Sequence, residues 1–501
     1  MRNRLCIEDL LPHGLRRIRG ESDPELRGIT ADSRRVESGD LFVALRGQAH
    51  DGLAHIPEAL RRGAAAVVCE FDLATQLADD TGVLYGADDP RAILGVGVRR
   101  VHDAPDRKLQ LFAVTGTNGK TTVTHLLRDL LHAMGTRCGL LGTIRYDTGK
   151  RERPAPLTTP GVEDFYALLA EMVDAGLTAC AFEASSHALD QQRLGPCEVD
   201  TAVFMNLEPE HLDYHVDLRG YLEAKRKLLV LLGGASKRAK AAGRCVVNAD
   251  CAAFAAVEWP SPTTFFGAAS RADFRRDTVR CDRDGIRFRL RAGDREQEIR
   301  SDLLGPYNVE NLHAALAAVL PMVDSWEELA TTARMTRPVA GRMEAVELPG
   351  GPLVVLDYAH TAEAIRAAIE ACRSFHDGRI AIVFGCGGDR DRSKRAPMAK
   401  SAVEGADLAV LTLDNPRGED PRQIFADALL GFQESIAEKR GVLIEDRGDA
   451  LRHALQWSTS ADLILVTGKG HERYQIIKDR REPWDDGERL RELWQGMEAG
   501  A

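Results

Sequence analysis

The chain has 501 residues, of which 44% are hydrophobic and 28% charged, and its formal net charge is −10. This composition is typical of a globular protein of about three domains, and the acidic balance argues against nucleic acid as a partner. The ten cysteines are scattered and include no CxxC pair, which predicts a cytoplasmic protein without a zinc site. The sequence shows no apolar leader and no long apolar run, so we expect neither a signal peptide nor a membrane span.

The N-terminal part of the chain alternates short apolar runs with short helical stretches. We expect strands at 39–47 and 64–70. The polar stretch 101–108 contains Pro105 and is typical of a linker. These features predict a smaller N-terminal α/β domain over residues 1–105.

The central part, residues 106–335, begins with an apolar strand at 109–114, the sequence TGTNGKTT (115–122) and an amphipathic helix up to Met134. Strand-like runs ending in polar residues follow. Strands that alternate with helices predict a doubly wound, mostly parallel sheet, which binds ligands at the carboxyl ends of its strands.

The sequence TGTNGKTT has the properties of a phosphate-binding loop. Gly116 and Gly119 let backbone N–H groups turn inward at a helix N-terminus. Lys120 is placed for β- and γ-phosphates and Thr121 for Mg²⁺. The match to the generic loop is partial, because Val114 stands where that loop has glycine.

The C-terminal part, residues 336–501, repeats the alternation and predicts a Rossmann-like α/β domain. Its strand-like runs end in glycine or charged residues, and helices are expected at 362–375 and 421–432. The run LTLDNPR ends at Arg417, in a segment that by itself indicates only a turn.

The loop and a series of further motifs resemble the Mur ligases, which are related to the folylpolyglutamate synthetases. The motifs occur in family order over almost the whole chain: TTP (158–160), FEASSHALDQQR (182–193), HLDYH (211–215), YLEAK (221–225), GPYNVENLHAA (305–315), GRME (341–344), DYAHT (357–361), GCGGDRDRSKR (385–395), DNPR (414–417) and GKGHE (468–472). The set favours the branch of the family that adds meso-diaminopimelate.

This resemblance implies that ATP phosphorylates the D-Glu carboxylate of UDP-MurNAc-L-Ala-D-Glu, and that the amine of diaminopimelate attacks the acyl phosphate. The implied cofactor is Mg²⁺, and the implied protein is a monomer. The implied catalytic residues are Lys120, Lys225, Glu183 and His211. The implied ATP-binding residues are Gly116, Thr117, Asn118, Gly119, Lys120, Thr121, Thr122, Asn308, Asn311, Arg342 and Asp357.

Lys225 is the least obvious of these residues. Because Arg226 and Lys227 follow it, the local sequence indicates an exposed basic face. The resemblance implies instead that CO₂ carbamylates a neutral Lys225 amine, so that it joins Thr121, Glu183 and His211 as a metal ligand.

The resemblance also assigns the two organic substrates. Contacts to the UDP-sugar peptide are expected from Ala31, Ser33, Gln48, Ala49, His50, Thr158, Thr159, Ser185, Gln191 and Arg193. Diaminopimelate contacts are expected from Arg390, Asp414, Asn415, Pro416, Arg417, Gly468 and Glu472. Arginine suits the distal carboxylate and Glu472 the ammonium. The chain departs from the family pattern at Leu157, Glu210 and Ala362, and Leu157 puts one substrate contact in question.

Two other classes of function remain open from the sequence. The first is a related ligase that adds lysine or extends folate with glutamate. The second is a nucleotide-binding switch protein without ligase activity, which would have no need of an amino-acid pocket.

Overall fold

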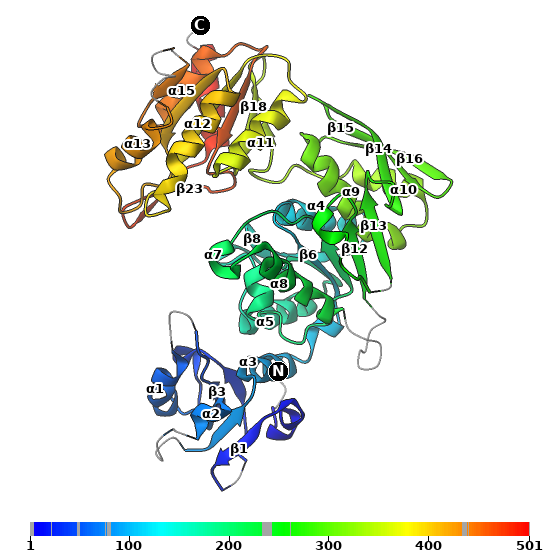
Figure 1. Cartoon of the computed structure of the whole chain (residues 1–501), viewed down its shortest axis with the longest axis vertical. Coiled ribbons are helices and arrows are strands. Elements are labelled where there is room, and N and C mark those ends of the chain that lie inside the picture. The colour runs from blue at the N-terminus through cyan, green and yellow to red at the C-terminus, as the bar shows by residue number, and fades with distance from the viewer. Residues whose placement is uncertain are drawn as a thin grey trace. The chain divides into compact units, whose positions relative to one another are not determined.

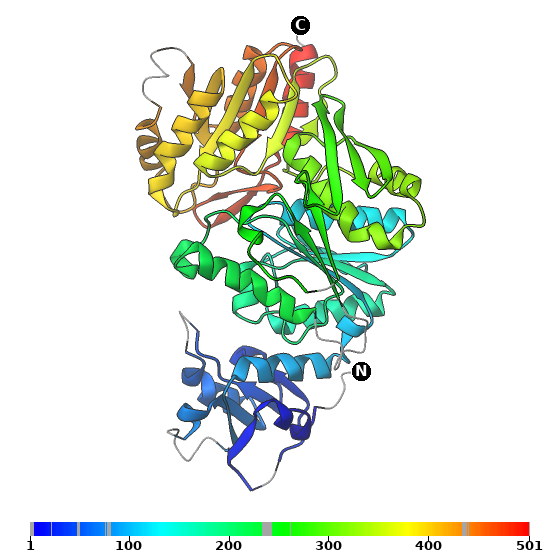
Figure 2. The same cartoon turned by 45° about the vertical axis from the view of Figure 1, so that its right-hand side comes forward.

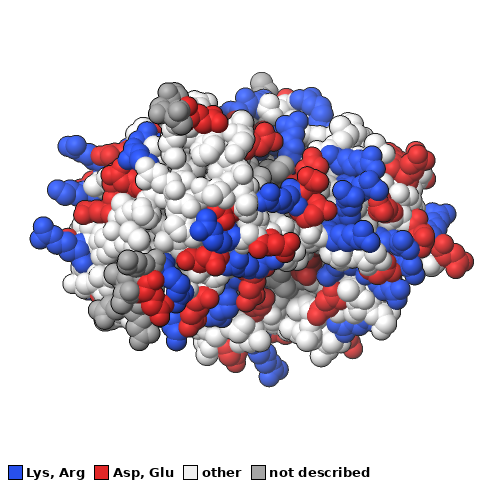
Figure 3. Space-filling model, turned by 90° about the horizontal axis from the view of Figure 1, so that it is seen from above, with Lys and Arg blue, Asp and Glu red and all other residues white. Residues whose placement is uncertain are grey.

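The computed structural model describes residues 5–21, 23–47, 51–75, 77, 82–232, 243–260, 262–432, 438 and 440–499. It divides into two compact units, one of residues 1–275 with 314–323 and one of residues 276–313 with 324–501. Within the described residues, no helix has the length and apolarity needed to cross a bilayer. On the face in Figure 3, basic and acidic side chains intermingle.

The first unit begins with a sheet of order β1-β5-β4-β3-β2, which is parallel except for β1 (Figure 1). Its strands are β1 (Arg16–Arg19), β2 (Gly28–Thr30), β3 (Asp40–Val43), β4 (Ala66–Glu70) and β5 (Leu84–Ala87). Its helices are α1 (Ile56–Arg61), α2 (Phe71–Ala74) and α3 (Pro90–Val101). Short 3₁₀ turns are η1 (Ile7–Asp9), η2 (Leu11–His13), η3 (Ser33–Arg35), η4 (Gly52–His55) and η6 (Pro105–Arg107).

The stretch predicted as a linker is a packed connection. Its first residue ends α3, and η6 follows. Asp106 is fully buried and accepts hydrogen bonds from Arg99, which also pairs with Glu198. The stretch does connect α3 to β6, and its buried contacts are a feature that the polar composition did not predict.

The central sheet of the first unit has the phosphate-loop strand near its middle, in the order β13-β12-β11-β6-β10-β7-β8-β9. From β13 to β7 the pairing is parallel, while β8 and β9 are antiparallel. Its strands are β6 (Gln110–Thr115), β7 (Cys138–Leu141), β8 (Arg145–Asp147), β9 (Glu152–Pro154), β10 (Ala179–Glu183), β11 (Thr201–Phe204), β12 (Arg244–Asn248) and β13 (Thr263–Gly267). Its helical elements are α4 (Lys120–Ala133), α5 (Val162–Asp174), α6 (Ser186–Asp190), α7 (Leu212–His215), α8 (Leu218–Leu231), η7 (Ala252–Phe254) and η8 (Leu320–Met322).

The strand β14 (Phe274–Asp282) and the helix α9 (Pro306–Val319) each contribute residues to both units. The second unit also contains the antiparallel pair β15 (Gly285–Ala292) and β16 (Arg295–Ser301), with α10 (Trp326–Ala333). These two strands were not predicted from the sequence.

The rest of the second unit is a doubly wound sheet of order β17-β18-β22-β19-β20-β21, parallel except at β17. Its strands are β17 (Glu344–Val346), β18 (Leu353–Asp357), β19 (Ile380–Cys386), β20 (Leu408–Leu413), β21 (Gly441–Leu443) and β22 (Leu463–Thr467), with the hairpin β23 (Tyr474–Ile477) and β24 (Arg480–Pro483) beside it. Its helical elements are α11 (Ala362–Arg373), η9 (Arg392–Lys394), α12 (Arg395–Gly405), α13 (Pro421–Leu429), α15 (Arg447–Trp457) and α16 (Asp486–Ala499).

Helices cover both faces of this sheet, as Figure 2 shows. One apolar core joins the sheet to α11, α12 and α13, and another joins it to α15 and α16. Because both faces are covered, the strands are apolar along their length. The polar residues follow at the carboxyl ends of the strands. The predicted fold class, three α/β regions with a phosphate loop in the central sheet, is confirmed.

A buried ion pair between α15 and α16 also contacts the ends of two strands. The guanidinium of Arg447 donates through Nε and Nη2 to the two carboxylate oxygens of Asp486, each over 2.7 Å. It also donates to the carbonyls of Leu413 and Thr467, which end β20 and β22. The indole N–H of Trp484 donates to the same carboxylate.

We predict that Arg447→Leu lowers the free energy of unfolding by about 3–5 kcal/mol, because it leaves the Asp486 carboxylate buried without its cation. The double variant Arg447→Leu/Asp486→Leu recovers much of this loss, since no uncompensated charge remains. Urea unfolding followed by tryptophan fluorescence measures both. Equal stability of Arg447→Leu and the parent chain would contradict the assigned role.

Candidate functional site

The phosphate loop is closely packed at its first glycine. Gly116 has φ +154°, and a Cβ on it would lie 2.8 Å from Cβ of Met205. Gly119 has a left-handed conformation at φ +86° and precedes Lys120, the first residue of α4. Both positions therefore require glycine, as predicted from the need for inward-facing backbone N–H groups.

The loop is held from the side by the segment that follows β11. The backbone N–H of Asn118 donates to Oδ1 of Asn206 over 2.8 Å, and its side-chain amide donates to Glu208 over 2.9 Å. The backbone N–H of Glu208 donates to the hydroxyl of Thr117. Asn206 and Glu208 were not among the predicted site residues, although their position after an apolar strand was a usable signal.

Two lysines converge on one backbone carbonyl of the loop. Lys120 Nζ donates to the carbonyl of Gly116 over 2.9 Å, and Lys225 Nζ donates to the same oxygen over 2.8 Å. Lys120 also donates to the carbonyl of Thr117. Lys120 places positive charge where the loop would bind phosphates, and the Lys225 amine lies beside it.

Lys225 is only 1% exposed, and its ammonium lies 4.2 Å from the ring centroid of Tyr221. The exposed basic face indicated by the local sequence is therefore wrong for this residue. Arg226 does pair with a partly exposed Glu223, and so belongs to such a face. Burial, with Lys120 nearby, holds the pKa of Lys225 well below its usual range.

Glu183 ends β10 and is 1% exposed. Its carboxylate accepts hydrogen bonds from the Thr121 hydroxyl at 3.1 Å, the Thr143 N–H at 2.7 Å and the Thr143 hydroxyl at 3.1 Å. A Cβ on Gly142 would lie 2.4 Å from this carboxylate. Thr143 and Gly142 were missed, because an ordinary strand-to-turn sequence carries them.

The oxygen atoms around Glu183 suit a hard cation such as Mg²⁺. Within the described part of the chain, no group of three or more His, Cys, Asp and Glu side chains is placed to hold a metal. Mg²⁺ typically binds one or two carboxylates and completes its shell with water and substrate phosphates. Glu183 and Thr121 fit that mode of binding.

His211 lies in a different environment from Glu183. It has φ +56°, precedes α7, and has its Nε2 3.8 Å from a carboxylate oxygen of Glu210. Its ring packs edge-on against His187 at 4.7 Å between centroids. Among the described contacts, none joins His211 to Glu183 or Lys225, so the protein alone does not assemble the predicted metal ligands into one cluster.

The residues predicted for the sugar-peptide end form a connected chain of hydrogen bonds. The hydroxyls of Thr158 and Thr159 contact those of Thr143 and Ser185, respectively. The remaining two residues pair with each other, since Arg193 donates to Oε1 of Gln191 over 2.7 Å. Arg193 also donates to the carbonyl of Thr159, which links the two groups. Leu157 is 48% exposed beside them.

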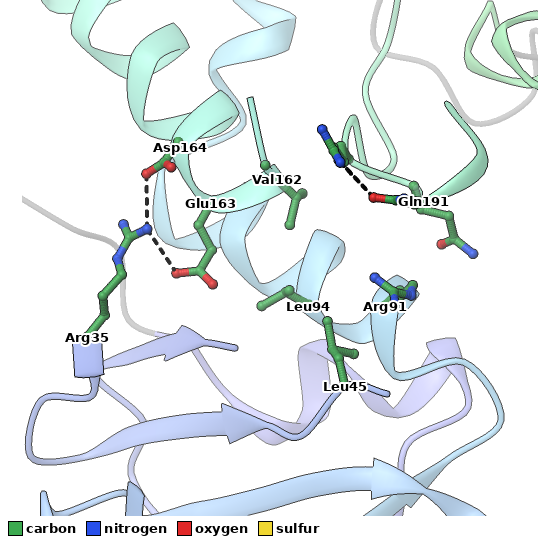
Figure 4. Close-up of a pocket in the computed structure, with 11 residues that line it drawn as sticks. Arg35, Leu45, Arg91, Leu94, Val162, Glu163, Asp164 and Gln191 are labelled. Atoms are coloured by element: carbon green, nitrogen blue, oxygen red, sulfur yellow. Dashed lines mark hydrogen bonds and ion pairs between the residues drawn. The ribbon is translucent and has the colours of Figure 1, made fainter. Parts of the chain in front are cut away.

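A pocket of about 240 Å³ lies in the first unit, between the N-terminal strands and α5 (Figure 4). It is lined by Arg35, Leu45, Arg91, Leu94, Gly161, Val162, Glu163, Asp164, Gln191, Gln192 and Arg193. Three of these residues are arginines, which suit an anionic ligand, although Arg35 is already paired with Asp164 at 3.0 Å and with Glu163 at 3.8 Å. Arg35 and Arg91 were not predicted. Arg35 follows another arginine in the segment 31–35, so the sequence does not single it out, and no sequence pattern indicates that Arg91 lies near Arg193.

The N-terminal residues predicted to bind the sugar nucleotide differ in their surroundings. The backbone N–H of Ala31 donates to Glu163 in the pocket wall over 2.9 Å. The hydroxyl of Ser33 donates instead to Glu58 over 2.6 Å. Gln48, Ala49 and His50 lie outside the described residues.

In the second unit, the predicted nucleotide residues form two groups. Asp357 accepts from the backbone N–H groups of Met343 and Ala359, and Arg342 lies over the ring of Tyr358 at 4.8 Å. Burial raises the pKa of Asp357, against the opposing effect of Arg342. Among the described residues, Nε of Arg342 is buried without a hydrogen-bond partner.

The other group is on α9. Asn311 donates through its side-chain amide to Oδ1 of Asn308, which itself donates to the carbonyl of Leu304. Asn308 is 1% exposed and Asn311 6%. Both polar atoms of the Asn308 side chain are thus engaged within the protein, while Asn311 is the more accessible of the two.

The residues predicted for the amino acid converge at the carboxyl ends of β19, β20 and β22. Asn415 donates through Nδ2 to Glu472 over 2.8 Å, and a Cβ on Gly468 would lie 3.6 Å from the Asp414 carboxyl carbon. Pro416 is buried in the turn. Burial raises the pKa of Glu472, although Arg417 opposes that effect.

Arg417 has φ +52° and is partly buried, with Nη1 donating to the carbonyls of Gly388 and Asn415. A Cβ on Gly387 would lie 3.1 Å from Nη1 of Arg417 and 3.5 Å from Cγ of Arg390. The two arginines therefore flank one glycine, with Arg390 exposed. Nε and Nη2 of Arg417 make no hydrogen bond within the described residues, so the fork remains available for a carboxylate.

Family models match three stretches of the chain. They are the Mur ligase family catalytic domain at residues 25–100, the Mur ligase middle domain at 114–319, and the Mur ligase glutamate ligase domain at 341–470. Together they cover all three regions of the fold.

Curated relatives match over nearly the whole chain. The UDP-N-acetylmuramoyl-L-alanyl-D-glutamate–2,6-diaminopimelate ligase of Geobacillus kaustophilus is 38% identical over 93% of this chain and 94% of its own. The protein of the same name from Ectopseudomonas mendocina is 39% identical, with the same coverage.

Solved structures give the same family. A structure described as this same ligase has a TM-score of 0.72 and 31% identity, and the match covers 99% of this chain and 100% of that chain. The MurF ligase of Thermotoga maritima, in complex with ADP, shares the fold at a TM-score of 0.57 and 19% identity, over 95% and 99%. The phosphate loop, the ordered motifs, the domain matches and these relatives together place the chain in the Mur ligase family.

Proposed function

We propose that the chain joins meso-diaminopimelate to the D-Glu carboxylate of UDP-MurNAc-L-Ala-D-Glu, with hydrolysis of ATP, in peptidoglycan precursor synthesis. The observation that carries the proposal is the set of charged groups at the ends of β20 and β22, which matches a zwitterion in a chain that also has a phosphate loop. The names of the relatives support the same reaction, and they favour neither lysine nor folate as substrate, nor a switch protein.

The chemistry asks the protein to bring two anions together. The D-Glu carboxylate attacks the γ-phosphorus and ADP leaves; the diaminopimelate amine then attacks the acyl phosphate, and phosphate leaves. Lys120 neutralises the phosphates, and Arg342 supplies a second cation from the C-terminal region. Glu183 and Thr121 would hold Mg²⁺, which supplies further charge stabilisation. Asn311, with Asn308 behind it, would bind the adenine.

We assign one role to each region of the chain. Residues 1–105 bind the UDP-sugar end of the substrate, and the pocket with Arg35, Arg91 and Arg193 is the site for its anionic part. Residues 106–335 bind ATP, and residues 336–501 bind the amino acid. All ten cysteines are free thiols, which supports the proposed cytoplasmic location. We propose a monomer as the active form.

The proposed activity predicts a product of defined mass. The protein, ATP, Mg²⁺ and UDP-MurNAc-L-Ala-D-Glu with meso-diaminopimelate should yield the new amide, with L-lysine used at least about 100-fold less efficiently. Lysine lacks the distal carboxylate and leaves Arg417 desolvated and unpaired, at a cost of about 2–4 kcal/mol. If no amide forms with either amino acid, the proposed function is wrong. If lysine is used as efficiently as diaminopimelate, only the proposed specificity is wrong.

Arg417 should distinguish the amino-acid site from the nucleotide site. We expect Arg417→Ala to raise KM for diaminopimelate by about 100-fold or more and to change KM for ATP by less than about threefold. Arg422→Ala, which removes an exposed arginine five residues away, is the matched control and should resemble the parent enzyme. An equal rise in both KM values for Arg417→Ala would mean that the residue only supports the fold.

Lys225 should be essential through a carboxylate formed on its amine. Its burial beside the loop carbonyl of Gly116 supports this proposal. Lys225→Ala should lose activity, and short carboxylic acids such as formate should raise the residual activity of this variant by at least about tenfold. Arg226→Ala should keep its activity and show no response to formate. Absence of rescue, together with an unmodified Lys225 amine in the active enzyme by mass spectrometry, would contradict the proposal.

A further inference from the structure

A buried lysine without an assigned role lies within the proposed amino-acid pocket. Lys469 follows β22 and is 1% exposed. Its ammonium lies 3.3 Å from a carboxylate oxygen of Asp414, and it donates to Oδ1 of Asn415 over 3.1 Å and to the carbonyl of Tyr474 over 2.9 Å. Its three nearest partners therefore come from the turn after β20 and from β23.

These contacts fix the orientation of the Asn415 amide. Oδ1 of Asn415 accepts from Lys469 and from the backbone N–H of Ile476 over 2.9 Å. With two donors on that side, the Nδ2 of Asn415 must face the other way, where it donates to Oε2 of Glu472. Lys469 thereby determines which side of the amide meets the carboxylate of Glu472.

The same lysine separates the tasks of two neighbouring carboxylates. Asp414 is paired with the cation of the protein itself. Glu472 shares only a neutral amide hydrogen bond in the described contacts, so its charge remains for an ammonium from the substrate. Without Lys469, the carboxylates of Asp414 and Glu472 would lose the cation that contacts Asp414 directly, and the nearby guanidinium of Arg447 is already paired with Asp486.

We propose that Lys469 is a positioning residue for the amino-acid substrate. It holds Asn415, and through Asn415 it holds Glu472, so that the remaining carboxylate oxygen of Glu472 receives the ammonium of the substrate. The inference rests on the proposed function, because it assumes that the zwitterion binds at these strand ends.

The test is a double-mutant cycle on the full-length enzyme, with KM measured separately for diaminopimelate and ATP. Lys469→Met should raise KM for diaminopimelate by at least about 30-fold, because one partner of a buried charged pair is removed. KM for ATP should change by less than about threefold. Asn415→Ser should have a similar effect, and the double variant should be no worse than the more impaired single variant by more than about threefold, since both residues act through Glu472.

Lys400→Met is the matched control, because Lys400 lies on the exposed side of α12, with its side chain 69% exposed. It should leave both KM values unchanged. Multiplying effects in the double variant, an unchanged KM for diaminopimelate in Lys469→Met, or equal increases in both KM values would each overturn the inference.

The possibility that Lys469→Met fails to fold is covered by the second single variant. Asn415→Ser retains the buried cation, and if it shows no selective rise in KM for diaminopimelate the inference is likewise overturned. A parent enzyme that forms no amide would instead refute the proposed function, which keeps the two failures distinguishable.

Discussion

Parallel strand pairing is the constraint on which both sites depend. In a parallel sheet, neighbouring strands end at the same edge, so polar residues from distant parts of the sequence meet there. β6 pairs with β10 and β11, which brings the phosphate loop beside Glu183 and Asn206. β19 pairs with β20 and β22. This pairing brings the DNPR turn (414–417) beside the glycines that follow β19, Gly387 and Gly388, and beside the GKGHE segment (468–472).

Burial of charged groups then determines which side chains are held in place at these strand ends. A buried ion is stable only with partners, and partners fix its position. Lys225 and Lys120 share the Gly116 carbonyl, and Lys469 is held by Asp414 and Asn415. In both places the protein holds a buried lysine against its own oxygen atoms before any substrate binds. Such preorganisation lowers the reorganisation needed when charged substrates meet.

The sequence was sufficient for the fold class. A phosphate loop between a strand and a helix, and polar residues after apolar strands, are local patterns that the structure confirms. Thr143, Gly142 and Lys469 were missed because their roles depend on approach to residues far along the chain. The environment of Lys225 was misjudged from its neighbours, because Lys227 is exposed while Lys225 is buried on the same helix. The packed connection around Asp106 escaped prediction because its partner Glu198 is 92 residues away.

The central claim is that the ends of β20 and β22 bind a zwitterion. The most direct measurement is a crystal structure of the enzyme with meso-diaminopimelate. We expect the distal carboxylate of the ligand to lie within hydrogen-bonding distance of the Arg417 guanidinium, with the neighbouring ammonium against Glu472. A ligand bound with its carboxylate away from Arg417, or with Glu472 facing no ammonium, would contradict it.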